Sequence, residues 1–241
     1  MSSVAFPIYV DTNETQGTEH ENLGGPQIVN ELKNIIGNDN IIGKNIIVDY
    51  MAKIPSSISH LLPWQLKHVI WEHIDDVRIR NAIDSSFEWN DIYLKDSLEN
   101  LDRLREILMN TGVLSPDMYN TLFIERKRID DFMASIKDGR LDKQAELMRS
   151  NSLMPPVFIV EGSKYDYASE YAKGRIIRGD NRPKYVIEEE IIGWMNGMTY
   201  RLKTFWDGIV IEVPYIDMHA YTAREIVGII SYLSIVWNIC R

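Results

Sequence analysis

The chain has 241 residues, of which 45% are hydrophobic and 25% are charged, and its formal net charge is -9. This composition predicts a soluble globular protein that forms one large domain or two small ones. The single cysteine, Cys240, excludes an intrachain disulfide and favours a reducing, intracellular compartment, either the cytoplasm or the nucleus.

Neither end of the sequence indicates a membrane segment. The N-terminal residues lack the basic region and long apolar core of a signal peptide. The apolar run at 226–240 contains two serines and an asparagine, and it is shorter than the roughly 20 residues that span a bilayer. We therefore expect a buried or dimer-forming helix there, and no contact with a membrane.

The N-terminal part predicts a strand, a helix and a second strand. Residues 7–14 are a short apolar strand that ends in acids, and residues 45–52 are another strand. Between them, Pro26 and Gly37 mark the start and the end of an amphipathic helix over 26–37. This alternation is typical of an α/β protein.

The alternation stops at residues 55–112. Apolar residues recur there at helical spacing over 63–83 and 91–110. One face of the second segment carries Leu94, Leu98, Leu101, Leu104 and Leu108. We interpret 55–112 as a helical hairpin inserted into a loop between two strands, because loop insertions cost little free energy. Its 10 acids and 6 bases over 55–110 favour a protein partner over DNA.

The α/β pattern resumes near residue 121. The expected elements are a strand at 121–127, helices near 129–137 and from Leu141, a strand at 155–162, a helix at 187–205 and a strand at 207–215. Thr222 and Glu225 have the spacing of a capping box, which would begin a last helix that runs to the C-terminus. The Gly- and Asn-bearing stretch 174–184 is expected to be a loop.

The acidic excess lies entirely in the N-terminal half. Residues 1–123 contain 18 acids and 9 bases, whereas residues 124–241 contain 17 of each. Basic residues gather near 126–149 and near 173–184. Each group can contact phosphates or can form a solvated face balanced by the interspersed acids.

The strand at 121–127 carries the most informative residues. Leu122, Phe123 and Ile124 predict a buried strand, and Glu125 and Lys127 follow it two positions apart. Residues at this spacing project from the same face of a strand. A carboxylate and an ammonium group therefore converge on one point, where a metal ion and a phosphate can meet.

The residues around this strand resemble a known signature. Ile124 to Lys127, then Asp131, then Asp138 to Arg140 with Gln144, are similar to the Glu-Arg-Lys-x3-Asp signature of the XPF/MUS-type structure-specific endonucleases, a branch of the PD-(D/E)xK nucleases. Val10 to Glu14 resemble the first strand of that family.

The resemblance covers residues 7–52 and 118–239, which we take as the core of a single nuclease domain over 1–241. It implies a restriction-endonuclease-like α/β fold, with a central mixed sheet flanked by helices and the helical insertion at 55–112.

The resemblance also implies a metal-binding aspartate at the end of the second strand, and two residues compete for this role. Asp49, followed by Tyr50, closes a β-branched strand. Asp117 lies closer in sequence to Glu125 but follows Pro116, which is poor context for a strand. We prefer Asp49 and keep Asp117 as the alternative.

The chemistry expected of this site is metal-assisted hydrolysis. Hard oxygen ligands suit Mg²⁺ or Mn²⁺, which stabilise negative charge on a phosphodiester under attack. Asp49 and Glu125 are the expected metal ligands, with Glu14 and Asp11 as catalytic support. Lys127 would orient the attacking water and offset phosphate charge.

The flanking residues have expected roles of their own. Asp131 would bind metal-bound water or hold a neighbouring basic group as part of the catalytic set. Arg140 and Gln144 lie four apart on one helical face and would meet the DNA backbone or steady the site. Arg126 and Arg128 complete the expected DNA-binding residues.

The sequence therefore predicts a divalent-metal-dependent endodeoxyribonuclease that cuts branched, flap or junction DNA. The alternative is a catalytically silent DNA-binding or scaffold subunit that is paired with an active nuclease. The apolar last helix and the habit of the family predict a homodimer. No tandem helix-hairpin-helix module of the family is visible in the sequence, so we expect substrate specificity to be either weak or supplied by another element.

Overall fold

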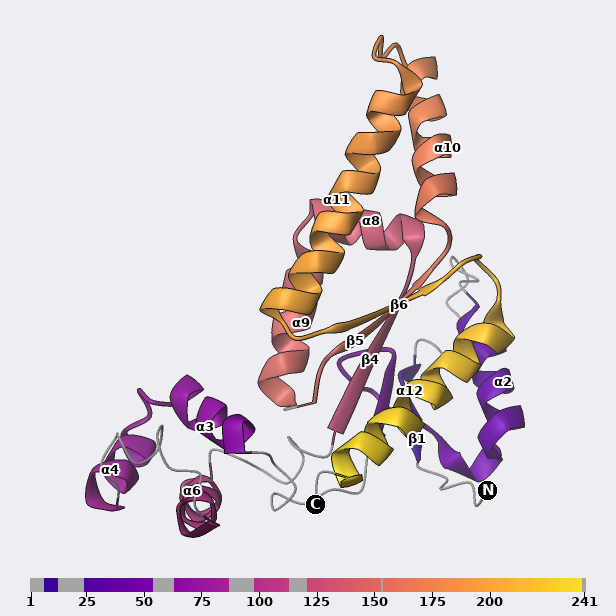
Figure 1. Ribbon diagram of the computed structural model, residues 1–241. Helices are drawn as coiled ribbons and strands as arrows, with labels where there is room; N and C mark the ends of the chain where they lie inside the picture. The colour runs from indigo at the N-terminus through magenta and orange to yellow at the C-terminus, as the bar shows by residue number, and fades with distance from the viewer. Residues whose placement is uncertain are drawn as a thin grey trace. The chain divides into compact units, whose positions relative to one another are not determined.

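The computed structural model describes residues 7–12, 24–53, 63–86, 98–112, 121–152 and 154–239 (Figure 1). The chain divides into two compact units. One unit comprises residues 1–54 and 121–232, and the other comprises residues 55–120 and 233–241.

The larger unit contains a mixed sheet, which confirms the expected α/β fold. Within the described residues the sheet has six strands in the order β2-β1-β3-β4-β5-β6. The strands are β1 Ile8–Val10, β2 Ile41–Gly43, β3 Tyr50–Lys53, β4 Thr121–Arg128, β5 Val157–Glu161 and β6 Ile209–Val213. The β1/β3 and β3/β4 pairs are antiparallel, and the other three pairs are parallel. Strand β4 therefore pairs antiparallel with β3 on one side and parallel with β5 on the other.

Strand β4 lies at the centre of the sheet and is buried over nearly its whole length. Ile124 pairs with Tyr50 of β3 on one side and with Val157 of β5 on the other. Because side chains alternate between the two faces of a strand, this pairing sends Phe123, Glu125 and Lys127 to one face.

The described α-helices of the larger unit are α2 Gly25–Ile36, α8 Ile129–Lys137, α9 Arg140–Asn151, α10 Lys164–Ile177, α11 Lys184–Phe205 and residues 219–232 of α12 His219–Ile239. On the face of Phe123, the core is filled by residues of α8, α9, α10 and α11, including Phe132, Leu141 and Ile191. Helices α2 and α12 lie side by side in both figures, and Gly24 at the start of α2 meets His219 at the start of α12. The predicted helices at 26–37, 129–137 and 187–205 are confirmed.

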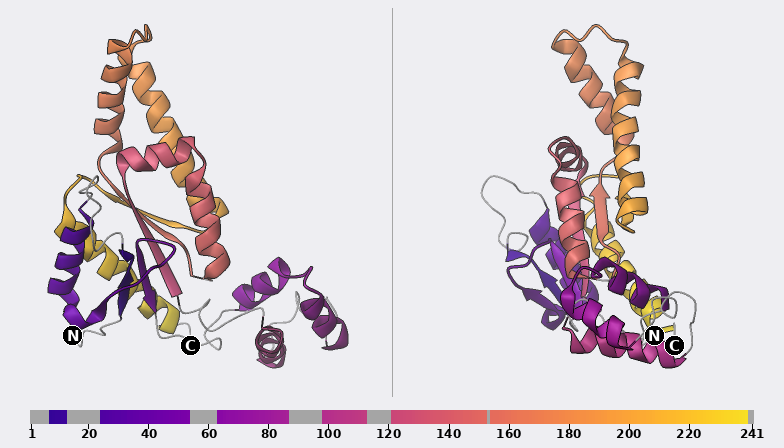
Figure 2. Two further views of the ribbon diagram at one scale, coloured as in Figure 1. Left: turned by 180° about the vertical axis from the view of Figure 1, so that it is seen from behind. Right: turned by 90° about the vertical axis from the view of Figure 1, so that its left-hand side faces the viewer.

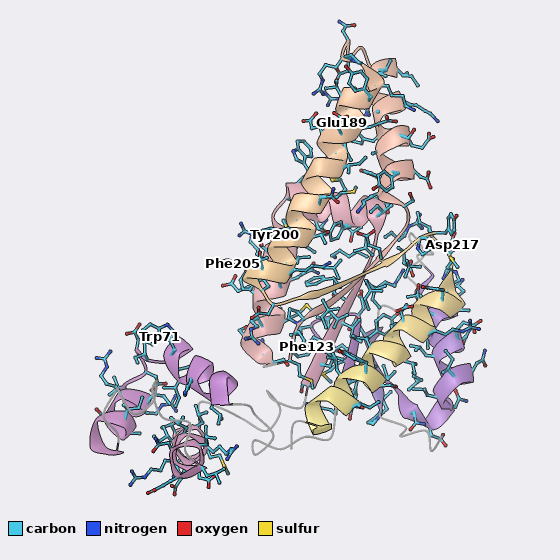
Figure 3. The ribbon with its side chains drawn as sticks, viewed as in Figure 1. Trp71, Phe123, Glu189, Tyr200, Phe205 and Asp217 are labelled. Carbon is cyan, nitrogen blue, oxygen red and sulfur yellow. The ribbon has the colours of Figure 1, made fainter. Side chains whose placement is uncertain are left out.

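Among the described α-helices of the larger unit, α10 is the one that the sequence did not predict. It begins at the N-cap Ser163, whose hydroxyl accepts a hydrogen bond from the Asp166 amide. With α11 it forms a hairpin that projects beyond the sheet (Figure 2). Exposed Tyr200 and Phe205 lie on the side of α11 that is turned away from β6 (Figure 3). The loop expected at 174–184 is shorter than predicted, because α10 extends to Ile177.

The smaller unit contains three described helices, α3 Pro63–Glu72, α4 Val77–Ser86 and α6 Leu98–Asn110. Leu101, Leu104 and Leu108 are buried as the helical spacing predicts. Leu98, at the first position of α6, is 79% exposed. Leu94 lies outside the described residues.

Two further predictions need correction. The strand expected at 45–52 begins only at Tyr50, because residues 47–49 form a bend. The capping box at Thr222 is absent, because α12 already begins at His219 and the Thr222 hydroxyl donates to Glu161 instead. In the part of the chain that the structure describes, no helix is both long and apolar enough to cross a membrane.

Candidate active site

The candidate site is built on the C-terminal end of β4. Glu125 and Lys127 project from the same face, and Lys127 Nζ lies 3.1 Å from Glu125 Oε1. Both residues are buried, with 5% and 6% of their surface exposed. A carboxylate and an ammonium group therefore meet in a place with little water, where their interaction is stronger than on the surface.

Helix α8 starts directly after β4 and brings a second carboxylate to Lys127. Asp131 Oδ2 lies 3.3 Å from Lys127 Nζ, and Asp131 Oδ1 lies 3.3 Å from Nη2 of Arg140. The Arg140 Nε also donates to Asp138 Oδ2 at 2.6 Å. The Arg140 side chain is 53% exposed. Arg140 thus stands at the rim of the site, where a phosphate can reach it.

Gln144 reaches Glu125 from the next helix, α9. Its amide Nε2 donates to Glu125 Oε1 at 2.7 Å. Its Oε1 atom is buried and has no hydrogen-bond partner among the described residues. Glu125 Oε1 therefore accepts from both Lys127 and Gln144, which fixes the orientation of the carboxylate.

Asp49, which lies just before β3, joins the site from the neighbouring strand. Its Oδ2 accepts a hydrogen bond from the Arg126 amide at 2.7 Å, and the Asp49 backbone hydrogen-bonds the Glu125 carboxylate. The backbone oxygen of Asp49 accepts from the Asp11 amide at 2.9 Å. The Asp11 carboxylate accepts from the Ile46 amide at 3.2 Å, which holds the turn after β2. Asp49 and Glu125 are thus brought together, with Asp11 behind Asp49.

Two expected site residues, Glu14 and Asp117, lie outside the described residues. The alternative between Asp49 and Asp117 therefore stays a prediction. What the structure adds is the position of Asp49, which is hydrogen-bonded to the residue next to Glu125.

Arg126 and Arg128 leave β4 on the opposite face. The Arg126 Nη1 atom donates to Glu161 Oε2 at 3.0 Å. The side chains of Arg126 and Glu161 are nearly inaccessible, at 3% and 1% exposed. The other Glu161 oxygen accepts from the Thr222 hydroxyl at 2.6 Å. Arg128 Nε lies 3.6 Å from Asp130 Oδ1. The Arg126 side chain, expected to bind DNA, is therefore enclosed in the core.

Burial changes the pKa values of the central pair. Burial raises the pKa of Glu125 above its ordinary value, and Lys127 and Gln144 partly offset this change because they stabilise the ionised carboxylate. Burial alone would lower the pKa of Lys127, but the attraction of Glu125 and Asp131 outweighs it and raises that pKa. Lys127 is accordingly a fixed positive charge at neutral pH.

This pair predicts a pH-dependent stability difference between the wild type and Lys127→Met. Without the ammonium group, the pKa of buried Glu125 rises further, so the folded state holds its proton to a higher pH. The Lys127→Met variant then loses stability as the pH rises from the ordinary pKa of a Glu side chain, 4.5, through the raised pKa of Glu125 in the folded state. We expect the two proteins to differ least below pH 4.5 and most above neutrality. Urea unfolding in EDTA between pH 4 and pH 8 measures this, and parallel curves would contradict it.

The donor atoms of the site fit a hard divalent cation. Asp49 and Glu125 supply carboxylate oxygens, and Mg²⁺ is usually bound through one or two carboxylates while it keeps several water molecules. Among the described residues, no group of three or more His, Cys, Asp or Glu side chains is arranged to hold an ion.

Sequence reasoning missed Glu161 and Thr222. The buried position of the Arg126 side chain could have been predicted from the sequence. Side chains alternate along a strand, so a residue between Glu125 and Lys127 must face away from them. No comparable pattern in the sequence marks the contact of Glu161 with Thr222, which is made between distant segments.

Comparison with known proteins identifies the family of the chain. The model of the ERCC4 domain matches residues 83–240. The crossover junction endonuclease mus-81 of Neurospora crassa is 27% identical over 136 residues, which cover 52% of this chain and 21% of that protein. The match thus spans about a fifth of the relative. With more than half of its residues matched, the chain belongs to the ERCC4 domain family of XPF/MUS81-type nucleases.

Proposed function

We propose that the protein is a divalent-metal-dependent DNA endonuclease that hydrolyses phosphodiester bonds, with branched, flap or junction DNA as its substrates. The observation that carries this proposal is the buried Glu125–Lys127 pair, which has Asp131 on one side and Asp49 on the other. Replacing a buried charged pair with apolar residues of similar volume is often neutral or stabilising. Its presence in a nuclease fold is therefore better explained by chemistry.

Each residue has a part in the proposed reaction. Asp49 and Glu125 would hold Mg²⁺ or Mn²⁺, and the bound ion would stabilise the negative charge of the phosphodiester and lower the pKa of its water. Lys127 would orient the attacking water and offset the charge of the phosphate. Asp131 holds the Lys127 ammonium in place, and Gln144 holds the Glu125 carboxylate.

The DNA contacts and partners are also proposals. Exposed Arg140 would contact the DNA backbone at the rim, and Arg128 is a weaker candidate because it faces Asp130. We further infer a homodimer formed through α12 and a protein partner for the helices of residues 55–112, whose acids outnumber their bases. An intracellular location follows from DNA as substrate.

The test is a cleavage assay with Mg²⁺ or Mn²⁺ on flap, fork, junction and linear duplex DNA. We expect cuts near the branch with the wild type, none in EDTA, and a loss of roughly 10³-fold or more with Glu125→Gln, because metal catalysis contributes several kcal/mol. Glu189 is an exposed residue of α11, so Glu189→Gln is the matched control and should cut normally. A wild type as inert as Glu125→Gln on every substrate would leave the scaffold role as the alternative.

A further inference from the structure

Arg126 is bonded in two directions, and we propose that it is a positioning residue that fixes where Asp49, Glu125 and Lys127 converge. Its backbone amide donates to Asp49 Oδ2 at 2.7 Å, and its guanidinium donates to Glu161 Oε2 at 3.0 Å on the opposite face of the sheet. This role rests on the proposed function, because the residues that Arg126 holds in place are the reacting ones.

The anchor of Arg126 is itself part of a buried network. Glu161 is the last residue of β5, and its second oxygen accepts from the Thr222 hydroxyl of α12 at 2.6 Å. Glu161 and Thr222 are essentially inaccessible, with 1% and 0% of their surface exposed. The network therefore ties β4, β5 and α12 together directly behind the candidate site, with each Glu161 oxygen hydrogen-bonded.

Stability alone does not explain such a network. Replacing a buried ion pair with apolar residues of similar volume is often neutral or stabilising, whereas the pair demands one specific geometry. Breaking it by removing one partner leaves a buried charge without compensation. We infer that this network contributes more to the uniqueness of the arrangement than to its free energy.

The arrangement that needs fixing here is the register of β4. Glu125 and Lys127 flank Arg126 in sequence, and in the sheet Arg126 pairs with Ile159 of β5. A shift of β4 by one residue would send Glu125 and Lys127 to the opposite face. The Arg126–Glu161 bond is satisfied only in the observed register, and the Arg126 amide then meets Asp49.

The decisive variants are Thr222→Val and Thr222→Ser. Valine keeps the shape but removes the hydroxyl, whereas serine keeps the hydroxyl. We expect Thr222→Val to lower kcat about 10-fold with KM for DNA unchanged within about 2-fold, since small displacements of catalytic groups have large effects on rate. Thr222→Ser should restore kcat. A second variant, Arg126→Met with Glu161→Leu, should stay folded and lose kcat by about 10- to 100-fold.

The matched control is Ser152→Ala. Ser152 is also buried, and its hydroxyl donates to the Thr121 backbone at the other end of β4. This variant should lower the melting temperature as Thr222→Val does, but keep kcat. A merely structural role would make the two variants alike in kcat once stability is matched.

A readout without activity is the exchange of the Arg126 amide proton, followed by NMR. We expect exchange to be at least about 10-fold faster in Thr222→Val than in Ser152→Ala, because only the first loosens the bond to Asp49. Unchanged exchange and kcat in Thr222→Val, or a higher KM at constant kcat in the double variant, would overturn the proposal. If the wild type cuts no DNA, the proposed function fails and the exchange rates alone decide the role of Arg126.

Discussion

Asp49→Asn is expected to abolish both metal binding and cleavage. Asparagine keeps the shape of the side chain but removes the charge that would hold a divalent cation beside Glu125. Because metal catalysis contributes several kcal/mol, we expect kcat to fall by roughly 10³-fold or more. Titration with Mn²⁺ followed by electron paramagnetic resonance measures the loss of binding directly, and cleavage of a labelled flap measures the rate.

Two comparison variants make this result specific. Asp117→Asn should retain activity, since Asp117 is the alternative ligand from the sequence; equal losses in both variants would reject our preference for Asp49. Asp39→Asn removes an exposed carboxylate from the same N-terminal segment and should leave Mn²⁺ binding unchanged. Normal Mn²⁺ binding by Asp49→Asn would show that the ion is held elsewhere.

Lys127→Met is expected to lower kcat by about 10²- to 10³-fold, the loss typical of removing one stabilising donor from a reacting group. Methionine keeps the apolar stem of lysine but removes the ammonium group that faces Glu125 and Asp131. Because the Lys127 side chain is buried, we expect the affinity for DNA to change by less than about 3-fold. Single-turnover cleavage gives the rate, and fluorescence anisotropy gives the affinity.

The contrast with Arg140→Ala separates chemistry from DNA binding. Arg140 is exposed at the rim, so its loss should weaken binding and reduce the salt dependence of affinity while kcat changes little. Lys203→Ala on α11 removes an exposed positive charge and is the control for net charge. If Lys127→Met weakened DNA binding as much as it slowed cleavage, Lys127 would be a DNA contact and not a catalytic residue.

The centre of the site was predictable because it depends on local pattern. An apolar run followed by Glu125 and Lys127 defines a buried strand and the face on which the two residues meet. Helices α8 and α9 follow from helical spacing and from Gly139 between them, which adopts a positive φ of 73°. These features need no knowledge of distant segments.

The features that escaped prediction depend on tertiary contacts. Helix α10 is rich in tyrosine and charged residues and buries only small side chains, Ala168 and Ala172, so its apolar pattern is weak. Strand β2 has three residues at the edge of the sheet, too few to show a period. Thr222 has the spacing of a cap, but its hydroxyl bonds to Glu161, which is remote in sequence.

Strands β3 and β4 are neighbours in the sheet but far apart in sequence, and this separation affects how the site could be assembled. Lys53 and Thr121 face each other across these strands, with Lys53 Nζ bonded to Thr121 Oγ1 at 2.6 Å, yet residues 54–120 separate them in sequence. A single peptide cut within 54–120 would divide the protein into two fragments, one with Asp49 and the other with Glu125. The β3/β4 pairing would then act as an interface between molecules, and activity would follow fragment concentration.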